Sequence, residues 1–216
     1  MNGKTMTLIE FFVHSPFKDS LVKGRAESDK NVTSIVMQVR FKKSSSDTKP
    51  SALYLFGGDA DHYIWEEIQN QSSAHNNGGK LDFDIFLAPH HCSWTYFNDV
   101  PYKKGETDEP VESSKKLIKD HKVSGAVIIA SSKQINDDDD NPPHYPAKKE
   151  YVKLIGSSDK FISLAEEPDS KNSKPVVYEV TSSGFLRKDK NQQTGSAGAA
   201  IGSSGTSGRK STYGSK

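Results

Sequence analysis

Two apolar stretches, each followed at once by a polar cluster, constrain this sequence more than any other feature. Residues 53–56 (LYLF) run into the cluster GGDAD at 57–61, and residues 81–88 (LDFDIFLA) run into PHHCS at 89–93. Short apolar runs bounded by glycine or proline predict buried strands. In a layered α/β protein, residues beyond the carboxyl ends of neighbouring strands share one crevice. The sequence therefore predicts that Asp59 and one of the two histidines meet there as half of a metal site.

The rest of the chain alternates predicted strands and helices, which is the order typical of an α/β protein. Strands are expected at 6–13, 31–41, 52–56, 81–88, 125–130 and 160–165, followed by a hairpin at 176–186 that turns at Ser183-Gly184. Helices are expected from near Ala60 to Ile68, and at 111–121 and 147–155. In the second strand, alternation places Ile35, Met37, Val39 and Phe41 on the expected core face. We expect this strand to lie antiparallel to 52–56.

Four motifs in a fixed order indicate a family. They are NVTS at 31–34, LFGGDAD at 55–61, LAPHHCS at 87–93 and NPPHYP at 141–146. The series resembles the metallo-β-lactamase fold of the ComEC/Rec2 competence type, whose members carry L-x-G-D-A-[ED], V-P-H-H-G-S and N-x-x-x-H-P, and it covers about residues 6 to 188. The resemblance implies the second half of an αββα sandwich, a mixed sheet with flanking helices. It also implies a hydrolase that cleaves phosphodiesters, with DNA or another nucleic acid as substrate, by metal-activated water.

The resemblance also implies roles for four residues. Asp59 and His91 would bind the metal, one or two Zn²⁺ ions with Mn²⁺ as the alternative, and His144 and His90 would act in catalysis. We favour His91 as the ligand because related metallohydrolases place their histidine second in a P-x-H string, and His90 stays the alternative. On an extended backbone the two side chains point opposite ways, so only one faces the metal. His144 would orient a phosphate or donate a proton to a leaving group.

The family's first metal motif, H-x-[HD]-x-D-H, does not occur in this sequence. No two of the seven histidines lie two positions apart. A zinc site takes three or four protein ligands, and this chain offers two. We therefore expect the missing ligands to come from a partner chain or from an amino-terminal half. The alternative is a non-catalytic module of the same fold, which binds or assembles with a partner through an open sheet edge or through the 94–110 loop.

Several other residues allow two interpretations. Asp61 is expected to cap the helix that follows it, rather than to bind metal. Cys92 is either a soft ligand or a small buried side chain, and we favour the second. The aromatic residues of the 94–110 loop either stack on a base or sugar, or fold over the core, which is the commoner outcome. We expect His14 in a loop, and His62 and His75 exposed.

Composition divides the chain into a body at 1–186 and a Gly/Ser-rich tail at 187–216, which is expected to be disordered. The tail carries six basic residues and one acid, and since the whole chain has a net charge of +1, the body is slightly acidic. Such a body argues against nucleic-acid binding by charge alone. One cysteine excludes an internal disulfide, and no apolar run approaches the roughly 20 residues that span a bilayer, so we expect a soluble, cytoplasmic protein without a membrane part.

Overall fold

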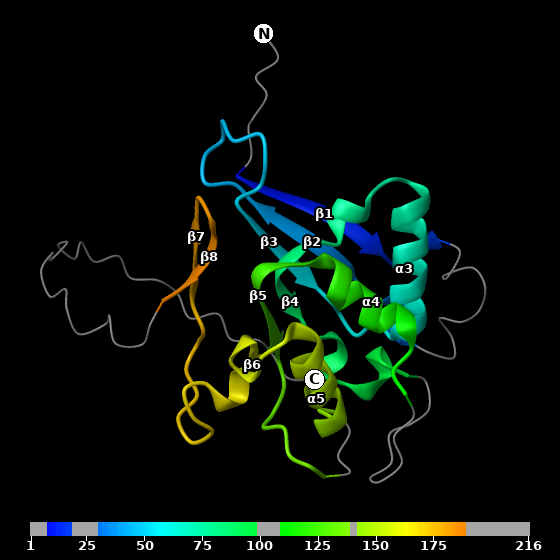
Figure 1. Cartoon of the computed structure of the whole chain (residues 1–216), viewed down its shortest axis with the longest axis vertical. Coiled ribbons are helices and arrows are strands. Elements are labelled where there is room, and N and C mark those ends of the chain that lie inside the picture. The colour runs from blue at the N-terminus through cyan, green and yellow to red at the C-terminus, as the bar shows by residue number, and fades with distance from the viewer. Residues whose placement is uncertain (1–7, 19–29, 99–108, 139–141, 189–216) are drawn as a thin grey trace, which may run out of the picture.

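A mixed sheet of six strands, in the order β1-β2-β3-β4-β5-β6, forms the centre of the molecule (Figure 1). The computed structural model describes residues 8–18, 30–98, 109–138 and 142–188. The strands are β1 Ile9–Ser15, β2 Val36–Phe41, β3 Ala52–Phe56, β4 Phe83–Leu87, β5 Lys122–Ala130 and β6 Phe161–Ser163. β2 is antiparallel to both of its neighbours, whereas β3, β4, β5 and β6 are parallel. The predicted α/β class, and the antiparallel pairing of β2 with β3, are confirmed.

Three helices cover one face of the sheet in the described part of the chain (Figure 1). They are α3 His62–Ala74, α4 Glu112–His121 and α5 Tyr145–Ile155. Each helix connects two successive parallel strands, because parallel strands need a crossover of this length. Trp65 of α3, Phe86 of β4 and Tyr151 of α5 are fully buried between helices and sheet, and they anchor the larger of two apolar cores.

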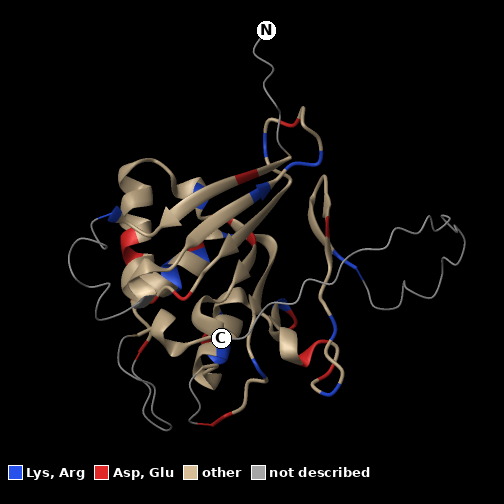
Figure 2. Ribbon diagram, turned by 180° about the vertical axis from the view of Figure 1, so that it is seen from behind, with Lys and Arg blue, Asp and Glu red and all other residues tan. Residues whose placement is uncertain are grey.

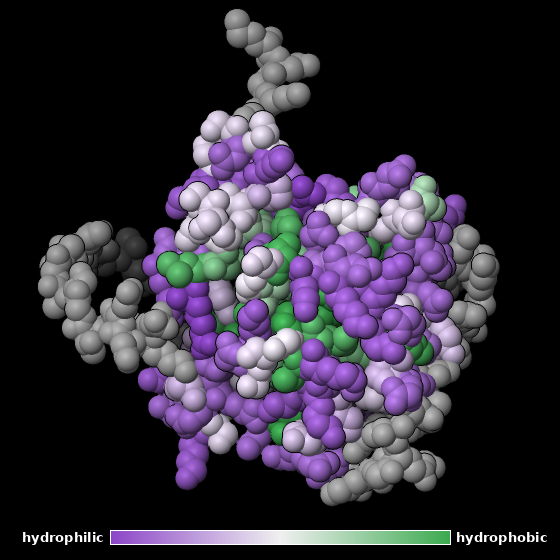
Figure 3. Space-filling model, in the orientation of Figure 1, coloured by the Kyte–Doolittle hydropathy of each residue, from purple (hydrophilic) through white to green (hydrophobic). Residues whose placement is uncertain are grey.

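The opposite face of the sheet is covered only in part. The hairpin of β7 Tyr178–Thr181 and β8 Gly184–Arg187 packs there, and it turns where the sequence predicted. Its Phe185 joins a second apolar core with Ile85, Ile129 and Ile162. Figure 3 shows apolar surface gathered between the hairpin and the helices, whose own outer surfaces are mostly hydrophilic. Figure 2, seen from behind, shows that none of the described helices covers β1, β2 and β3 on this face.

Local sequence accounts for the ends of two helices. Asp61 caps α3, since its Oδ1 accepts a hydrogen bond from the Ile64 N–H at 3.1 Å, as the sequence predicted. α5 follows His144 with a proline in its first turn, where a missing N–H costs nothing. It ends at Gly156, whose φ of +98° is a conformation that glycine adopts readily.

The predicted core face of β2 is wrong in part. Residues 30–33 form a 3-10 turn, and the strand begins only at Val36. Val36 is fully buried beneath the helices, whereas Ile35 is 60% exposed. Because both faces of β2 carry covered positions, alternation alone does not identify the inner face.

The predictions from the sequence for two histidines, His14 and His62, are wrong. His14 lies within β1 and is buried, since its ring contacts the Lys80 carbonyl from a distant loop. His62 begins α3 and is also buried, whereas His75 is exposed as expected. α3 also runs on through Ala74, past the end expected at Ile68. Tyr102, Asn141 and the tail beyond residue 188 lie outside the described residues.

Candidate active site

The two polar clusters meet at the carboxyl ends of β3 and β4. These strands are parallel neighbours, with Phe56 opposite Leu87. Beyond them the His90 N–H donates a hydrogen bond to the Gly58 carbonyl at 2.8 Å, so the two loops touch through their backbones. Asp59, the next residue, is exposed. The sheet thus delivers Asp59 and the histidine pair to one edge, as expected from the order of the strands.

Two glycines allow this close approach. A Cβ atom on Gly57 would lie 2.6 Å from the Leu87 carbonyl oxygen and 2.6 Å from a ring carbon of Pro89. A Cβ atom on Gly58, whose φ is +55°, would lie 2.6 Å from the Ile35 carbonyl oxygen. Real Cβ atoms do not approach carbonyl oxygens this closely, so larger residues at 57 or 58 would force the loops apart.

The histidine pair lies in an unusual backbone conformation. His90, His91 and Cys92 have φ angles of +46°, +55° and +68°, three left-handed residues in a row. Each such residue costs about 1–2 kcal/mol. The turn is held by hydrogen bonds from the Cys92 and Ser93 N–H groups to the Pro89 carbonyl, in addition to the bond with Gly58. The extended geometry expected for this pair is therefore wrong, and alternation cannot decide between His90 and His91.

Hydrogen bonding favours His91 as a ligand. Its Nδ1 lies 2.6 Å from the Ser131 carbonyl oxygen at the end of β5. A carbonyl oxygen only accepts, so the proton is on Nδ1 and neutral His91 carries its lone pair on Nε2. The side chain is exposed. Histidines that bind metals commonly donate one ring N–H to a carbonyl and coordinate through the other nitrogen.

His144 has the opposite tautomer. The backbone N–H of His144 donates a hydrogen bond to the Cys92 carbonyl at 3.0 Å. The backbone N–H of Trp94 donates to the ring Nδ1 of His144 at 2.9 Å. Neutral His144 therefore carries its proton on Nε2. Burial lowers the pKa of His144, the nearby His90 lowers it further, and Asp138 opposes both. At neutral pH the ring is uncharged and carries its proton on Nε2.

Ser93 and Thr95 link the two candidate catalytic histidines, and the sequence did not indicate them. The Thr95 hydroxyl donates to Ser93 Oγ at 3.1 Å and lies 3.5 Å from His90 Nδ1. Ser93 Oγ lies 3.5 Å from His144 Nδ1. Since the one Thr95 proton goes to Ser93, the Thr95 oxygen accepts from His90 Nδ1, which leaves the His90 lone pair on Nε2. The signal in the sequence for these two residues was a serine and a threonine two positions apart, which follow the histidine pair after Cys92.

Several predicted alternatives are now decided. Cys92 is fully buried, and burial raises its thiol pKa, so it is the small core side chain that we favoured. Trp94, Tyr96 and Phe97 are buried in the main core, which confirms that these aromatic residues fold inward.

The donor set is short of a complete zinc site. No group of three or more histidine, cysteine, aspartate or glutamate side chains that could hold a metal ion exists among the described residues. Asp59 and His91 come from neighbouring loops, but a zinc site takes at least three protein ligands. The described residues therefore do not fit a zinc ion by themselves.

These features define an α/β protein in which the loops that carry His90, His91 and His144 meet beyond the carboxyl ends of the parallel strands. Comparisons of the chain with family models, with curated proteins and with solved structures found no match. No helix in the part of the chain that the structure describes is long and apolar enough to cross a bilayer.

Proposed function

We propose that this chain contributes one half of a metallo-β-lactamase-like hydrolytic site of the ComEC type. The substrate class is a phosphodiester, such as the backbone of DNA or another nucleic acid. A second chain, or a segment that precedes this one, completes the site. The motif order in the sequence and the crevice at the strand ends support this proposal.

The observation that carries the proposal is the pair of opposite tautomers on His91 and His144. His91 is held through Nδ1 and presents a lone pair, whereas His144 is held through Nδ1 as an acceptor and presents an N–H. Both rings are fixed by backbone groups, so their orientation costs little when a ligand binds. A site that hydrolyses an anionic substrate needs both kinds of group. A lone pair binds an electrophile, and an N–H donates a hydrogen bond to the negative charge that develops in the reaction.

His144 orients a phosphate in this proposal, rather than protonating a leaving group. Its lowered pKa makes the imidazolium form scarce at neutral pH, so it is a poor proton donor. Its neutral Nε2–H instead donates a hydrogen bond to a phosphate oxygen. His90, whose Nδ1–H bonds Thr95, accepts the proton of the attacking water on Nε2 and then returns it to the leaving oxygen.

Zinc or manganese enters the proposal only with ligands from outside the described residues. Asp59 and His91 are the two ligands that this chain would contribute. Metal affinity of the chain alone should therefore be weak, since two ligands leave most of the coordination shell to water.

Metal binding and phosphodiester cleavage test the proposal together. Zinc is titrated against a chromophoric chelator, and cleavage of bis(p-nitrophenyl) phosphate is followed with zinc or manganese, for the chain alone and with a cell extract that supplies the second half. We expect Asp59→Ala and His91→Ala to lose zinc binding. His144→Ala should keep zinc binding but lose cleavage, because it acts on the phosphate.

Asp120→Ala and His121→Ala are the matched controls, because both residues lie on α4 away from the crevice. If the controls lower zinc binding as much as Asp59→Ala and His91→Ala, the metal is bound elsewhere and the ligand assignment fails. If no zinc-dependent cleavage appears with any extract, the hydrolase proposal fails.

A second candidate function is a non-catalytic assembly module, and one surface favours it. Ile9, Phe11 and Val13, here called the β1 strip, are 44%, 65% and 60% exposed. They pair with Phe41, Val39 and Met37, and so share the sheet face that the hairpin covers only in part. Exposed apolar rows on an edge strand commonly bind another chain.

Isolation of a complex with a second polypeptide would distinguish the assembly module from the hydrolase. We expect Phe11→Lys to abolish a complex isolated from source cells, while Asp59→Ala leaves it intact. Leu186→Lys, on the hairpin and 53% exposed, is the control for adding a lysine outside the strip. Loss of the complex in Leu186→Lys as well would show that charge, rather than the strip, decides binding.

A further inference from the structure

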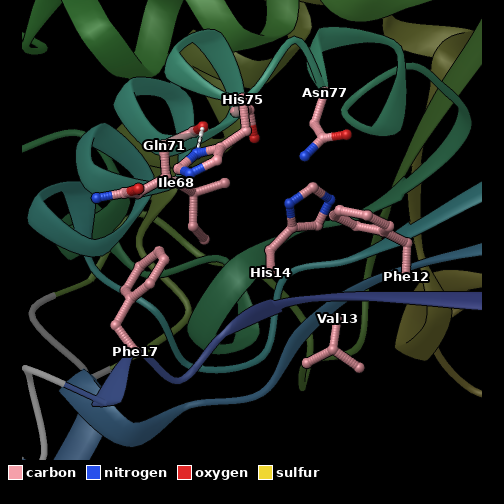
Figure 4. Close-up of a pocket in the computed structure, with 9 residues that line it drawn as sticks. Phe12, Val13, His14, Phe17, Ile68, Gln71, His75 and Asn77 are labelled. Atoms are coloured by element: carbon pink, nitrogen blue, oxygen red, sulfur yellow. Dashed lines mark hydrogen bonds between the residues drawn. The ribbon is translucent and has the colours of Figure 1, made fainter.

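A cavity of about 120 Å³ lies between the end of β1 and the carboxyl-terminal half of α3 (Figure 4). Phe12 and Phe17 from the β1 side and Ile68 from α3 supply its apolar walls. The described residues that line the cavity include no aspartate, glutamate, lysine or arginine. In volume the cavity is close to the apolar cavity of about 150 Å³ that holds benzene, so it has room for one small ring.

His14 places one hydrogen-bond acceptor in this cavity. Its Nε2 lies 2.9 Å from the Lys80 carbonyl oxygen, so the proton is on Nε2 and the lone pair is on Nδ1. Figure 4 shows the ring between Phe12 and the open space, with one edge toward that space. The side chain is only 8% exposed. Burial lowers the pKa of His14, the hydrogen bond with the Lys80 carbonyl opposes this, and His121 and Lys80 add to the lowering, so the ring is neutral at pH 7.

Asn77 adds a second polar group beside His14. Its side chain points toward the His14 ring in Figure 4, and it makes no capping hydrogen bond to the 3-10 turn that follows it. An asparagine amide both donates and accepts. An acceptor nitrogen next to an amide is complementary to a ring N–H next to a carbonyl. The described lining offers no carboxylate, lysine or arginine to pair with a charged ligand, so it favours a neutral one.

We propose that this cavity binds one neutral, planar heterocycle with a ring N–H beside a carbonyl, the class to which pyrimidine bases belong. The ring N–H donates to His14 Nδ1, and the carbonyl accepts from the Asn77 amide. The faces of the ring pack against Phe17 and Ile68. This proposal uses no residue of the His90 and His144 crevice, and it stands whether or not the chain hydrolyses phosphodiesters.

Uracil and 1,3-dimethyluracil form the matched pair of probes, because methylation removes both ring N–H groups and keeps the ring and carbonyls. We expect uracil to shift amide resonances of β1 and α3 in ¹H–¹⁵N spectra of the full chain. 1,3-Dimethyluracil should bind about tenfold more weakly or not at all, since one buried hydrogen bond is lost. Uracil affinity should also fall on acidification, as protonation of His14 removes the acceptor.

His14→Gln and Asn77→Ala should each weaken uracil binding by about tenfold, and Ser73→Ala, exposed on α3 outside the cavity, should not. If His14→Gln fails to fold, Asn77→Ala and the two probes still carry the test. Equal binding of uracil and 1,3-dimethyluracil, or shifts confined to other elements, would overturn the proposal. So would the absence of any shift up to the solubility limit of uracil.

Discussion

Gly58 is the residue at which a single methyl group should do most damage to the crevice. In Gly58→Ala the alanine must adopt a φ of +55°. Its Cβ also meets the Ile35 carbonyl oxygen at 2.6 Å. The Gly58 carbonyl also accepts the hydrogen bond from the His90 N–H. Any movement that relieves the contact with Ile35 therefore disturbs the histidine turn as well.

The expected loss of unfolding free energy in Gly58→Ala has two parts. Substitutions at two other glycines measure each part alone. A left-handed alanine costs about 1–2 kcal/mol, and overpacking against backbone costs about 1–3 kcal/mol more. Gly156→Ala has the positive φ, +98°, with open space around its Cβ, so it should lose only the backbone part. Gly57→Ala has the close contacts without a positive φ, so it should lose only the packing part. Gly58→Ala should lose about 2–5 kcal/mol, a large share of a typical stability of 5–15 kcal/mol.

Urea unfolding, followed by circular dichroism, measures all three variants on one scale. We expect Gly58→Ala to have the lowest midpoint, below both Gly156→Ala and Gly57→Ala, with the slope of the transition unchanged. If Gly58→Ala costs no more than Gly156→Ala, the Ile35 carbonyl does not press on residue 58. The packing of the β3 loop that brings Asp59 to the crevice would then be incorrect.

Three further predictions concern single side chains. Asp61→Ala should destabilise the fold by about 1 kcal/mol through loss of the α3 cap, measured as a lower urea midpoint. Stability should fall on acidification, because the folded pKa values of His14 and His144 lie below the unfolded value near 6.5, so the unfolded chain binds protons first. The stabilisation is complete above that unfolded value and is lost as pH falls through the folded pKa, and His144→Gln should reduce the slope. Cys92 should react with a thiol reagent only as fast as the chain unfolds, since it is fully buried and its pKa is raised.

The regular elements follow from the sequence because their signals are local. β4 and β5 are short apolar runs, and α4 carries Leu117 and Ile118 on one face, so period and burial coincide. Burial of His14 and His62 does not follow, because it depends on residues distant in the chain. A neutral imidazole that is hydrogen-bonded to the backbone is compatible with a core. Composition does not indicate which histidines of the chain are buried in this way.

The candidate site was predictable in place but not in detail. Parallel strands carry the clusters at 57–61 and 89–93 to one edge, and that follows from strand order alone. The left-handed turn at His90 and His91 does not, because the Gly58 carbonyl and the Pro89 carbonyl hold it from outside the dipeptide. Ser93 and Thr95 acquire their role only once His144 is brought beside them.

Backbone groups, more than side chains, set the proton positions in the crevice. The Ser131 carbonyl keeps the His91 proton on Nδ1, and the Trp94 N–H keeps the His144 proton on Nε2. No substitution at 131 removes the carbonyl, and at 94 only proline removes the N–H, so the two tautomers depend on the path of the chain. That path in turn depends on the close contact at Gly57 and Gly58. The chemistry of the crevice is therefore coupled to the packing of the two strand ends, and a variant that separates them should change both histidines together.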